Sequence, residues 1–190
     1  MTAVRSNMRI KIKYIIYAAV IIAGVLIAVD LLAVWHSPSS KYLSAGEQAP
    51  NYSFQLENGT TSTVASYRGR PLLLWFVATW CDSCALGNVA LSDNLAFFKE
   101  HNVSIVELEQ YKDLGEPGMP ISQFISKYAN DTYIKGGTAG YNMTLAYNTP
   151  PNFQLDIYYL INPSGKILYV GEGIASGIAG LESMIDDYKL

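Results

Sequence analysis

Two cysteines, Cys81 and Cys84, restrict the fold of this chain more than any other feature. They follow a short apolar run at residues 71–78 (PLLLWFVA), whose length suits a central strand covered on both faces. The segment after them, residues 84–100, is predicted to be helical. The sequence therefore predicts a strand, a CxxC motif and a helix in direct succession, a context in which CxxC indicates thiol chemistry.

The chain has no other cysteine. The loop between the two is too short to constrain the unfolded chain much, and two ligands do not complete a structural zinc site. A dithiol that alternates with a Cys81–Cys84 disulfide is the natural use, without metal or cofactor. Because a helix N-terminus favours an anion, we expect Cys81 to attack as the thiolate and Cys84 to resolve the mixed disulfide.

Three neighbours, Trp80, Asp82 and Ser83, are expected to support the pair. Asp82 lies between the cysteines, and its negative charge should oppose thiolate formation at Cys81. We therefore expect a more reducing couple than one with a basic residue in this position.

The remaining pattern predicts an α/β domain with a mixed sheet. Further strands are expected at 51–56, 103–108, 156–161 and 166–170, and further helices at 121–128 and 174–190. The last two strands enclose the turn sequence NPSG (162–165) and should form a β-hairpin. Residues 115–120 are predicted to be a loop, whereas residues 132–149 show no firm period.

The N-terminal region predicts a membrane anchor. Residues 14–35 contain one charged residue, Asp30, and a helix of these 22 residues would be about 33 Å long, enough to cross a bilayer. The preceding residues 1–13 are basic, which places them in the cytoplasm and the rest outside. A cleaved signal peptide is the alternative. Residues 36–45 are a linker, and the folded domain is expected at 46–190.

Charge and sequons agree with an exterior location. Beyond the apolar segment there are nine Lys/Arg and fifteen Asp/Glu, a net charge of −6 that disfavours nucleic acid as a partner. The same part of the chain carries five Asn-x-Ser/Thr sequons, which suggest N-glycosylation. Their asparagines are Asn51, Asn58, Asn102, Asn130 and Asn142.

Several motifs resemble those of the TlpA/ResA-type thioredoxin-like proteins. They are GEQAP (46–50), Gly59, YRGRP (67–71), FVATWCDSC (76–84) and the hairpin YYLINPSGKI (158–167). The resemblance implies a thioredoxin fold, an outward-facing anchored domain and reduction of protein disulfides, as in cytochrome c maturation. A location outside the membrane also implies two kinds of partner: extracytoplasmic proteins that contain disulfides, and a transmembrane thiol carrier that supplies electrons.

The chain departs from this family at the residues that usually assist the dithiol. Counting back from the hairpin puts Asp156 in the place of the family's cis-proline, unless a local insertion lets Pro150 or Pro151 fill it; otherwise these prolines only shape a loop. Trp75 stands where thioredoxins carry a buried acid and is expected to be core packing. Gly87 stands where some relatives have a glutamate.

With those acids missing, Asp156 is a candidate proton acceptor for Cys84. The alternative is an exposed or hydrogen-bonded aspartate at the start of a strand. Other functions also remain open: a copper chaperone, for which His101 is a weak candidate ligand, and a binding module whose dithiol senses redox state. A thiol peroxidase is disfavoured, because neither cysteine follows a Thr-x-x or Ser-x-x pattern.

Overall fold

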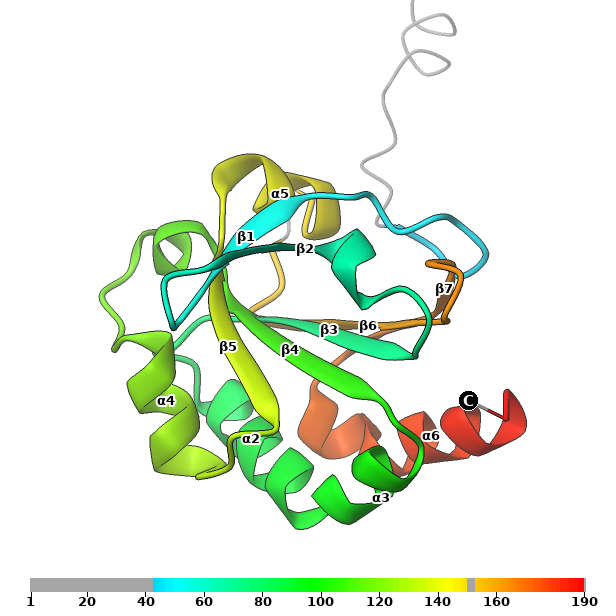
Figure 1. Cartoon of the computed structure of the whole chain (residues 1–190). Coiled ribbons are helices and arrows are strands. Elements are labelled where there is room, and N and C mark those ends of the chain that lie inside the picture. The colour runs from blue at the N-terminus through cyan, green and yellow to red at the C-terminus, as the bar shows by residue number, and fades with distance from the viewer. Residues whose placement is uncertain (1–42, 150–152, 190) are drawn as a thin grey trace, which may run out of the picture. The chain divides into compact units, whose positions relative to one another are not determined.

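The computed structural model describes residues 43–149 and 153–189. Within these residues, seven strands form one mixed sheet in the order β2-β1-β5-β4-β3-β6-β7 (Figure 1). The strands are β1 (Ser53–Leu56), β2 (Thr61–Thr63), β3 (Leu72–Val77), β4 (Ser104–Glu109), β5 (Ile134–Ala139), β6 (Asp156–Ile161) and β7 (Ile167–Glu172). The predicted α/β architecture with a mixed sheet is confirmed.

The strand before the cysteines, β3, lies inside the sheet. It runs parallel to β4 and antiparallel to β6, and all six of its residues are buried. This burial explains its uninterrupted apolar sequence, since a strand covered on both faces has no solvent side to make polar. The end of β3 delivers the chain directly to the CxxC motif.

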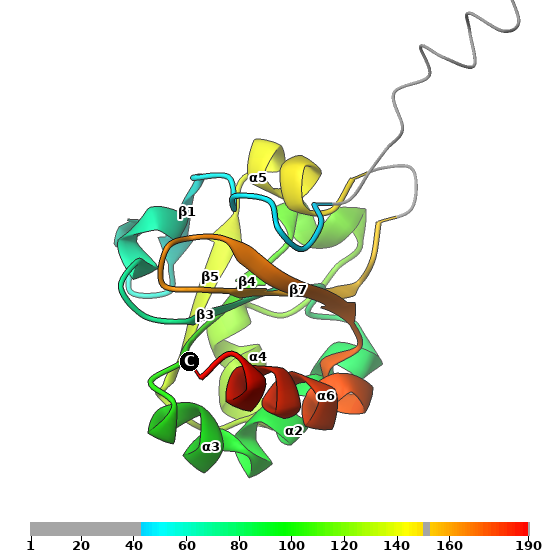
Figure 2. The ribbon, with the colours of Figure 1, turned by 90° about the vertical axis from the view of Figure 1, so that its right-hand side faces the viewer.

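Helices cover both faces of the sheet (Figure 2). The helices are α2 (Asp82–Asp93), α3 (Leu95–Glu100), α4 (Ile121–Tyr128), α5 (Tyr141–Tyr147) and α6 (Ile174–Asp187), with 3-10 helices η1 (Val64–Tyr67) and η2 (Tyr111–Gly115). On one face, α2, α3, α4 and α6 share an apolar cluster with Trp75 and Leu160. On the other, α5 and η1 pack with Phe76 and Tyr159.

The hairpin and the helix at Ile121–Tyr128 lie where they were expected. The predicted helix at 84–100 is instead two helices, because the chain leaves helical geometry at Asn94. The region without a firm period forms β5 and α5, and β2 was not predicted. The domain includes residues 46–48, since the Gly46 amide donates to the Ile167 carbonyl and Gln48 bridges to Lys166.

The expected cytoplasmic segment 1–13, the membrane segment 14–35 and most of the linker 36–45 lie outside the described residues, as do Pro150 and Pro151. In the part of the chain that is described, no helix is both long and apolar enough to cross a membrane.

Candidate active site

The two cysteines occupy the junction between β3 and α2. Cys81 is the N-cap residue of α2, and its Sγ accepts a hydrogen bond from the backbone N–H of Cys84 at 3.3 Å. The Cys81 amide donates to the Ala78 carbonyl, which closes a tight turn after the strand. The sulfur of Cys81 therefore lies where unpaired amide groups and the helix dipole stabilise negative charge. The predicted position of the motif is confirmed.

Both cysteines are free in the structure, and the predicted Cys81–Cys84 disulfide stays a prediction. Cys81 is 5% exposed and Cys84 is fully buried. The Ser83 hydroxyl lies 3.0 Å from the Cys81 sulfur, and the Cys84 thiol donates to the Leu155 carbonyl at 3.0 Å. Burial raises the pKa of Cys84, and its hydrogen bond with Cys81 and the charge of Asp156 raise it further.

Asp156 begins β6 and is buried, which excludes the exposed form of the alternative interpretation, whereas its hydrogen bonds fit the hydrogen-bonded form. Its Oδ1 accepts hydrogen bonds from the Trp75 indole at 2.7 Å and from the Ile174 amide at 3.5 Å. Burial raises the pKa of Asp156, although the hydrogen bonds from Trp75 and Ile174 oppose this shift. Within the described residues, Asp156 Oδ2 has no hydrogen-bond partner. The side chain is thus both held in place and able to accept a proton.

Trp75 and Gly87 form one packing unit beneath the dithiol. Trp75 is fully buried, which agrees with the expected core role, but its indole also positions the Asp156 carboxyl. A Cβ at Gly87 would lie 2.7 Å from Trp75 Cζ2. The helix therefore carries glycine at this position because the indole fills the space beneath it.

The supporting residues of the motif lie at the surface. Asp82 and Ser83 are exposed in the first turn of α2, so the charge of Asp82 is well hydrated. Trp80 is 38% exposed, and its indole N–H donates to the backbone carbonyl of Asp113 at 2.8 Å. An exposed indole beside a reactive sulfur offers an apolar contact to an incoming polypeptide.

Two further polar residues near the motif, Asp113 and Glu107, were not predicted from the sequence. Asp113 is buried, and its carboxylate accepts hydrogen bonds from Thr79. Glu107 is fully buried on β4, where Asn88 of α2 donates to its Oε1 at 2.8 Å. Burial raises the pKa of Glu107 to about 8. The acid within the apolar strand 103–108 was a visible signal for Glu107, whereas Asp113 lies in a segment without a pattern.

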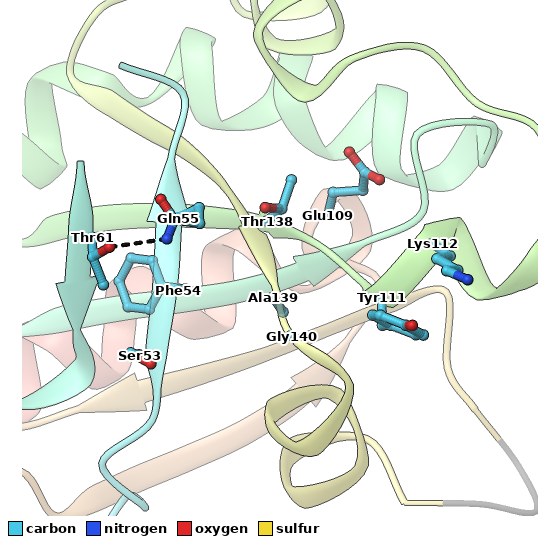
Figure 3. Close-up of a pocket in the computed structure, with 10 residues that line it drawn as sticks. All are labelled: Ser53, Phe54, Gln55, Thr61, Glu109, Tyr111, Lys112, Thr138, Ala139 and Gly140. Carbon is cyan, nitrogen blue, oxygen red and sulfur yellow. Dashed lines mark hydrogen bonds between the residues drawn. The ribbon is translucent and has the colours of Figure 1, made fainter. Parts of the chain in front are cut away.

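Three hollows surround this region. One of about 300 Å³ adjoins the dithiol and is lined by Ser83, Phe153, Gln154, Leu155, Asp156, Glu172 and Gly173. An apolar one of about 240 Å³ lies between η2 and α5 and shares Phe153 with the first. The third, of about 490 Å³, is more polar and extends from β1 and β5 to Tyr111 and Lys112 of η2 (Figure 3). Phe153 lines the first two hollows, and η2 lines the second and the third.

Comparison with known proteins agrees with this geometry. The AhpC/TSA family matches residues 45–135. Thiol-disulfide oxidoreductase ResA of Bacillus subtilis is 29% identical over 146 residues, which cover 77% of this chain and 74% of that relative. The resemblance to ResA-type proteins is thereby confirmed.

Solved structures show the same fold at low sequence identity. A structure described as thiol:disulfide interchange protein DsbE from Chlorobium tepidum has a TM-score of 0.64 and 18% identity, covering 78% of this chain and 99% of its own. Copper-bound ScoI of Arabidopsis thaliana has a TM-score of 0.57 and 15% identity, covering 75% and 100%. The predicted thioredoxin-like fold is therefore confirmed for the described domain.

Proposed function

We propose that this member of the thioredoxin-like superfamily, a thiol–disulfide oxidoreductase, uses Cys81 and Cys84 to reduce protein disulfides on the outer side of a membrane. The observation that carries the proposal is the position of Cys81 as N-cap of α2, with the buried thiol of Cys84 behind it. This places an attacking sulfur at the helix N-terminus, slightly exposed, and a fully buried resolving sulfur three residues further along the chain.

The reaction follows from these two positions. The Cys81 thiolate attacks one sulfur of a substrate disulfide, forming a mixed disulfide and releasing the other sulfur as a thiolate. Cys84 then loses its proton and attacks the Cys81 sulfur, which releases the second substrate thiolate and leaves a Cys81–Cys84 disulfide. Two electrons pass from the dithiol to the substrate. A transmembrane thiol carrier would return the protein to the dithiol state by the same exchange chemistry.

Asp156 is the proposed proton acceptor for Cys84. A buried thiol whose pKa is raised resolves slowly unless a base takes its proton. Asp156 is buried nearby, its own pKa is raised, and one of its oxygens is without a hydrogen-bond partner in the described part of the chain. The raised pKa makes Asp156 a stronger base than an exposed carboxylate, which brings its proton affinity closer to that of the thiol.

The proposed location rests on the N-terminal sequence and on the surface of the domain. The apolar segment 14–35 would anchor the chain, with the basic residues 1–13 in the cytoplasm. N-glycosylation of the outer domain is part of the same proposal. All five sequon asparagines are exposed, as an acceptor must be: Asn51, Asn58, Asn102, Asn130 and Asn142.

A trapping experiment tests the proposed chemistry. With Cys84→Ser, the full chain should stop at a mixed disulfide between Cys81 and a disulfide-bonded peptide, visible by intact mass. Cys81→Ser should give no adduct and no turnover, whereas the wild type should turn over many equivalents when reductant is supplied. A wild-type protein that is oxidised once without turnover would instead indicate a redox sensor, and peroxide consumption would indicate a peroxidase.

Copper delivery is tested separately by titration with Cu(I). Among residues 43–149 and 153–189, no three His, Cys, Asp or Glu side chains are grouped so that they could hold a metal ion. His101 lies at the end of α3, where its Nε2 is 3.0 Å from Asp186 of α6. Tight binding of one Cu(I) that depends on His101 would favour the chaperone alternative.

A further inference from the structure

The segment after β4 has an unusual backbone. Three consecutive residues of η2, Lys112, Asp113 and Leu114, have φ of 50°, 51° and 59°, in the left-handed region. None is glycine, so each carries a Cβ that disfavours this conformation. Such strain persists only where the surroundings hold it, and it occurs preferentially at functional sites. The contacts of Asp113 show what holds this turn.

Asp113 accepts three hydrogen bonds from the two residues that precede Cys81. Its Oδ1 accepts from the Thr79 amide at 2.8 Å, and its Oδ2 accepts from the Thr79 hydroxyl at 2.6 Å. Its backbone carbonyl accepts from the Trp80 indole at 2.8 Å. A Cβ at Gly118 would lie 1.8 Å from Asp113 Oδ2 and 2.1 Å from Thr79 Oγ1, so the chain closes over this contact at a glycine.

These bonds fix the turn that carries Cys81. Thr79 is buried, and without Asp113 its amide and hydroxyl would both lose these partners away from water. On the other side of the turn, the Leu155 carbonyl accepts from the Ala78 amide at 3.1 Å. The residues between β3 and α2 are therefore held from two directions, by Leu155 and by Asp113.

We propose that Asp113 is a positioning residue of the active site: it fixes Thr79 and Trp80, and through them holds Cys81 at the N-terminus of α2. The proposal rests on the proposed function of the dithiol. The same turn places Tyr111 and Lys112 along the walls of two hollows, one of which is drawn in Figure 3, so the anchor at Asp113 also shapes these walls.

The test compares variants of the full chain that all carry Trp35→Phe. Because Trp75 is buried, quenching of the remaining tryptophan fluorescence by acrylamide then reports on the exposed indole of Trp80. With Asp113→Ala, alkylation of Cys81 by iodoacetamide should slow about tenfold, because the sulfur is no longer held at the helix N-terminus. The acrylamide quenching constant of Trp80 should rise about twofold, because Thr79 no longer holds the turn that presents the backbone carbonyl of residue 113 to the indole.

Asp113→Asn should restore both readouts to within about threefold of wild type, because an amide can accept from the Thr79 amide and donate to the Thr79 hydroxyl. Asn102→Gly is the matched control, since Asn102 is another left-handed residue but lies in the turn before β4. It should change neither readout.

The proposal is overturned if the folded Asp113→Ala variant matches the wild type in both the alkylation rate of Cys81 and the acrylamide quenching constant of Trp80. If that variant does not fold, Thr79→Val decides, because it removes only the hydroxyl contact. Alkylation slowed about threefold supports the proposal, and an unchanged rate overturns it. Neither readout requires turnover, so a wild type that fails to reduce peptide disulfides would refute the proposed function and leave this test intact.

Discussion

At the scale of single residues, the proposed reaction depends on the transfer of a proton from Cys84 to Asp156. Cys84 is a buried thiol, and Asp156 is the buried acid whose charge acts on it. The Trp75 indole fixes one carboxyl oxygen of Asp156. The sequence placed Asp156 next to the dithiol through the hairpin register, but it gave no sign that Trp75 would hold it.

Asp156→Asn should slow the resolution of the mixed disulfide about tenfold to a hundredfold, because the amide cannot take the Cys84 proton. In the wild type, the rate should increase with pH as Asp156 ionises, over a range above that of an ordinary aspartate because its pKa is raised. In the Asp156→Asn variant, this increase of the rate with pH should be absent. Stopped-flow measurement of peptide thiol release across pH checks both effects.

Asp93→Asn is the control for that experiment, because Asp93 is exposed at the other end of the same helix. Its profile should match the wild type. An Asp156→Asn variant with an unchanged pH–rate profile would remove Asp156 from the mechanism and leave it as a structural ligand of Trp75.

At the scale of elements, α2 must pack closely on β3 to bring Cys84 beneath Cys81. Gly87→Ala should destabilise the domain by about 1–3 kcal/mol, because its Cβ would meet Trp75 at 2.7 Å. Gly180→Ala in α6 is the matched control: it is exposed with no atom within 4 Å of an added Cβ, and should stabilise by up to about 1 kcal/mol. Denaturant unfolding gives the free energy of unfolding of both variants. Equal changes in Gly87→Ala and Gly180→Ala would contradict this packing.

Local sequence predicted the elements whose pattern is local. The apolar β3, the helix at Ile121–Tyr128 and the turn of the hairpin were all recognisable. β5 was not, because Gly136 and Gly137 weaken its strand pattern. Both are required by neighbours on other elements: a Cβ at Gly136 would meet Ile125 of α4, and one at Gly137 would meet the Gln55 carbonyl of β1.

The candidate site divides in the same way. Cys81 and Cys84 follow from spacing and context, since a short-range motif carries their chemistry. The contact between Asp113 and Thr79 joins residues 34 positions apart and requires a left-handed turn, which no local pattern in the segment predicts. Such contacts exist only once β3 and β4 lie side by side.

At the scale of the whole molecule, the buried Glu107 makes stability depend on pH. Its pKa is about 8 in the folded domain against an ordinary value of 4.5, so the folded state binds the proton more tightly. The stability that this group contributes is complete below about pH 4.5 and is lost as pH rises toward 8, at about 1.4 kcal/mol per unit.

Glu107→Gln should remove this dependence. A glutamine can accept from Asn88 and donate back to it, as the neutral acid can, so the variant should equal the wild type near pH 5 and exceed its stability near pH 8. Unfolding free energies of both proteins at several pH values test the difference between them. Parallel curves would show that Glu107 does not carry the pH effect.

The central claim, a dithiol that acts as a reductant, is tested most directly by the reduction potential of the Cys81–Cys84 pair in the full chain. Equilibration with glutathione or dithiothreitol buffers, followed by thiol labelling and intact mass, gives this value. We expect a potential near or below about −230 mV, in the range of reducing members of the fold. A potential near about −120 mV would identify a disulfide-forming oxidant and contradict the proposed direction of electron flow.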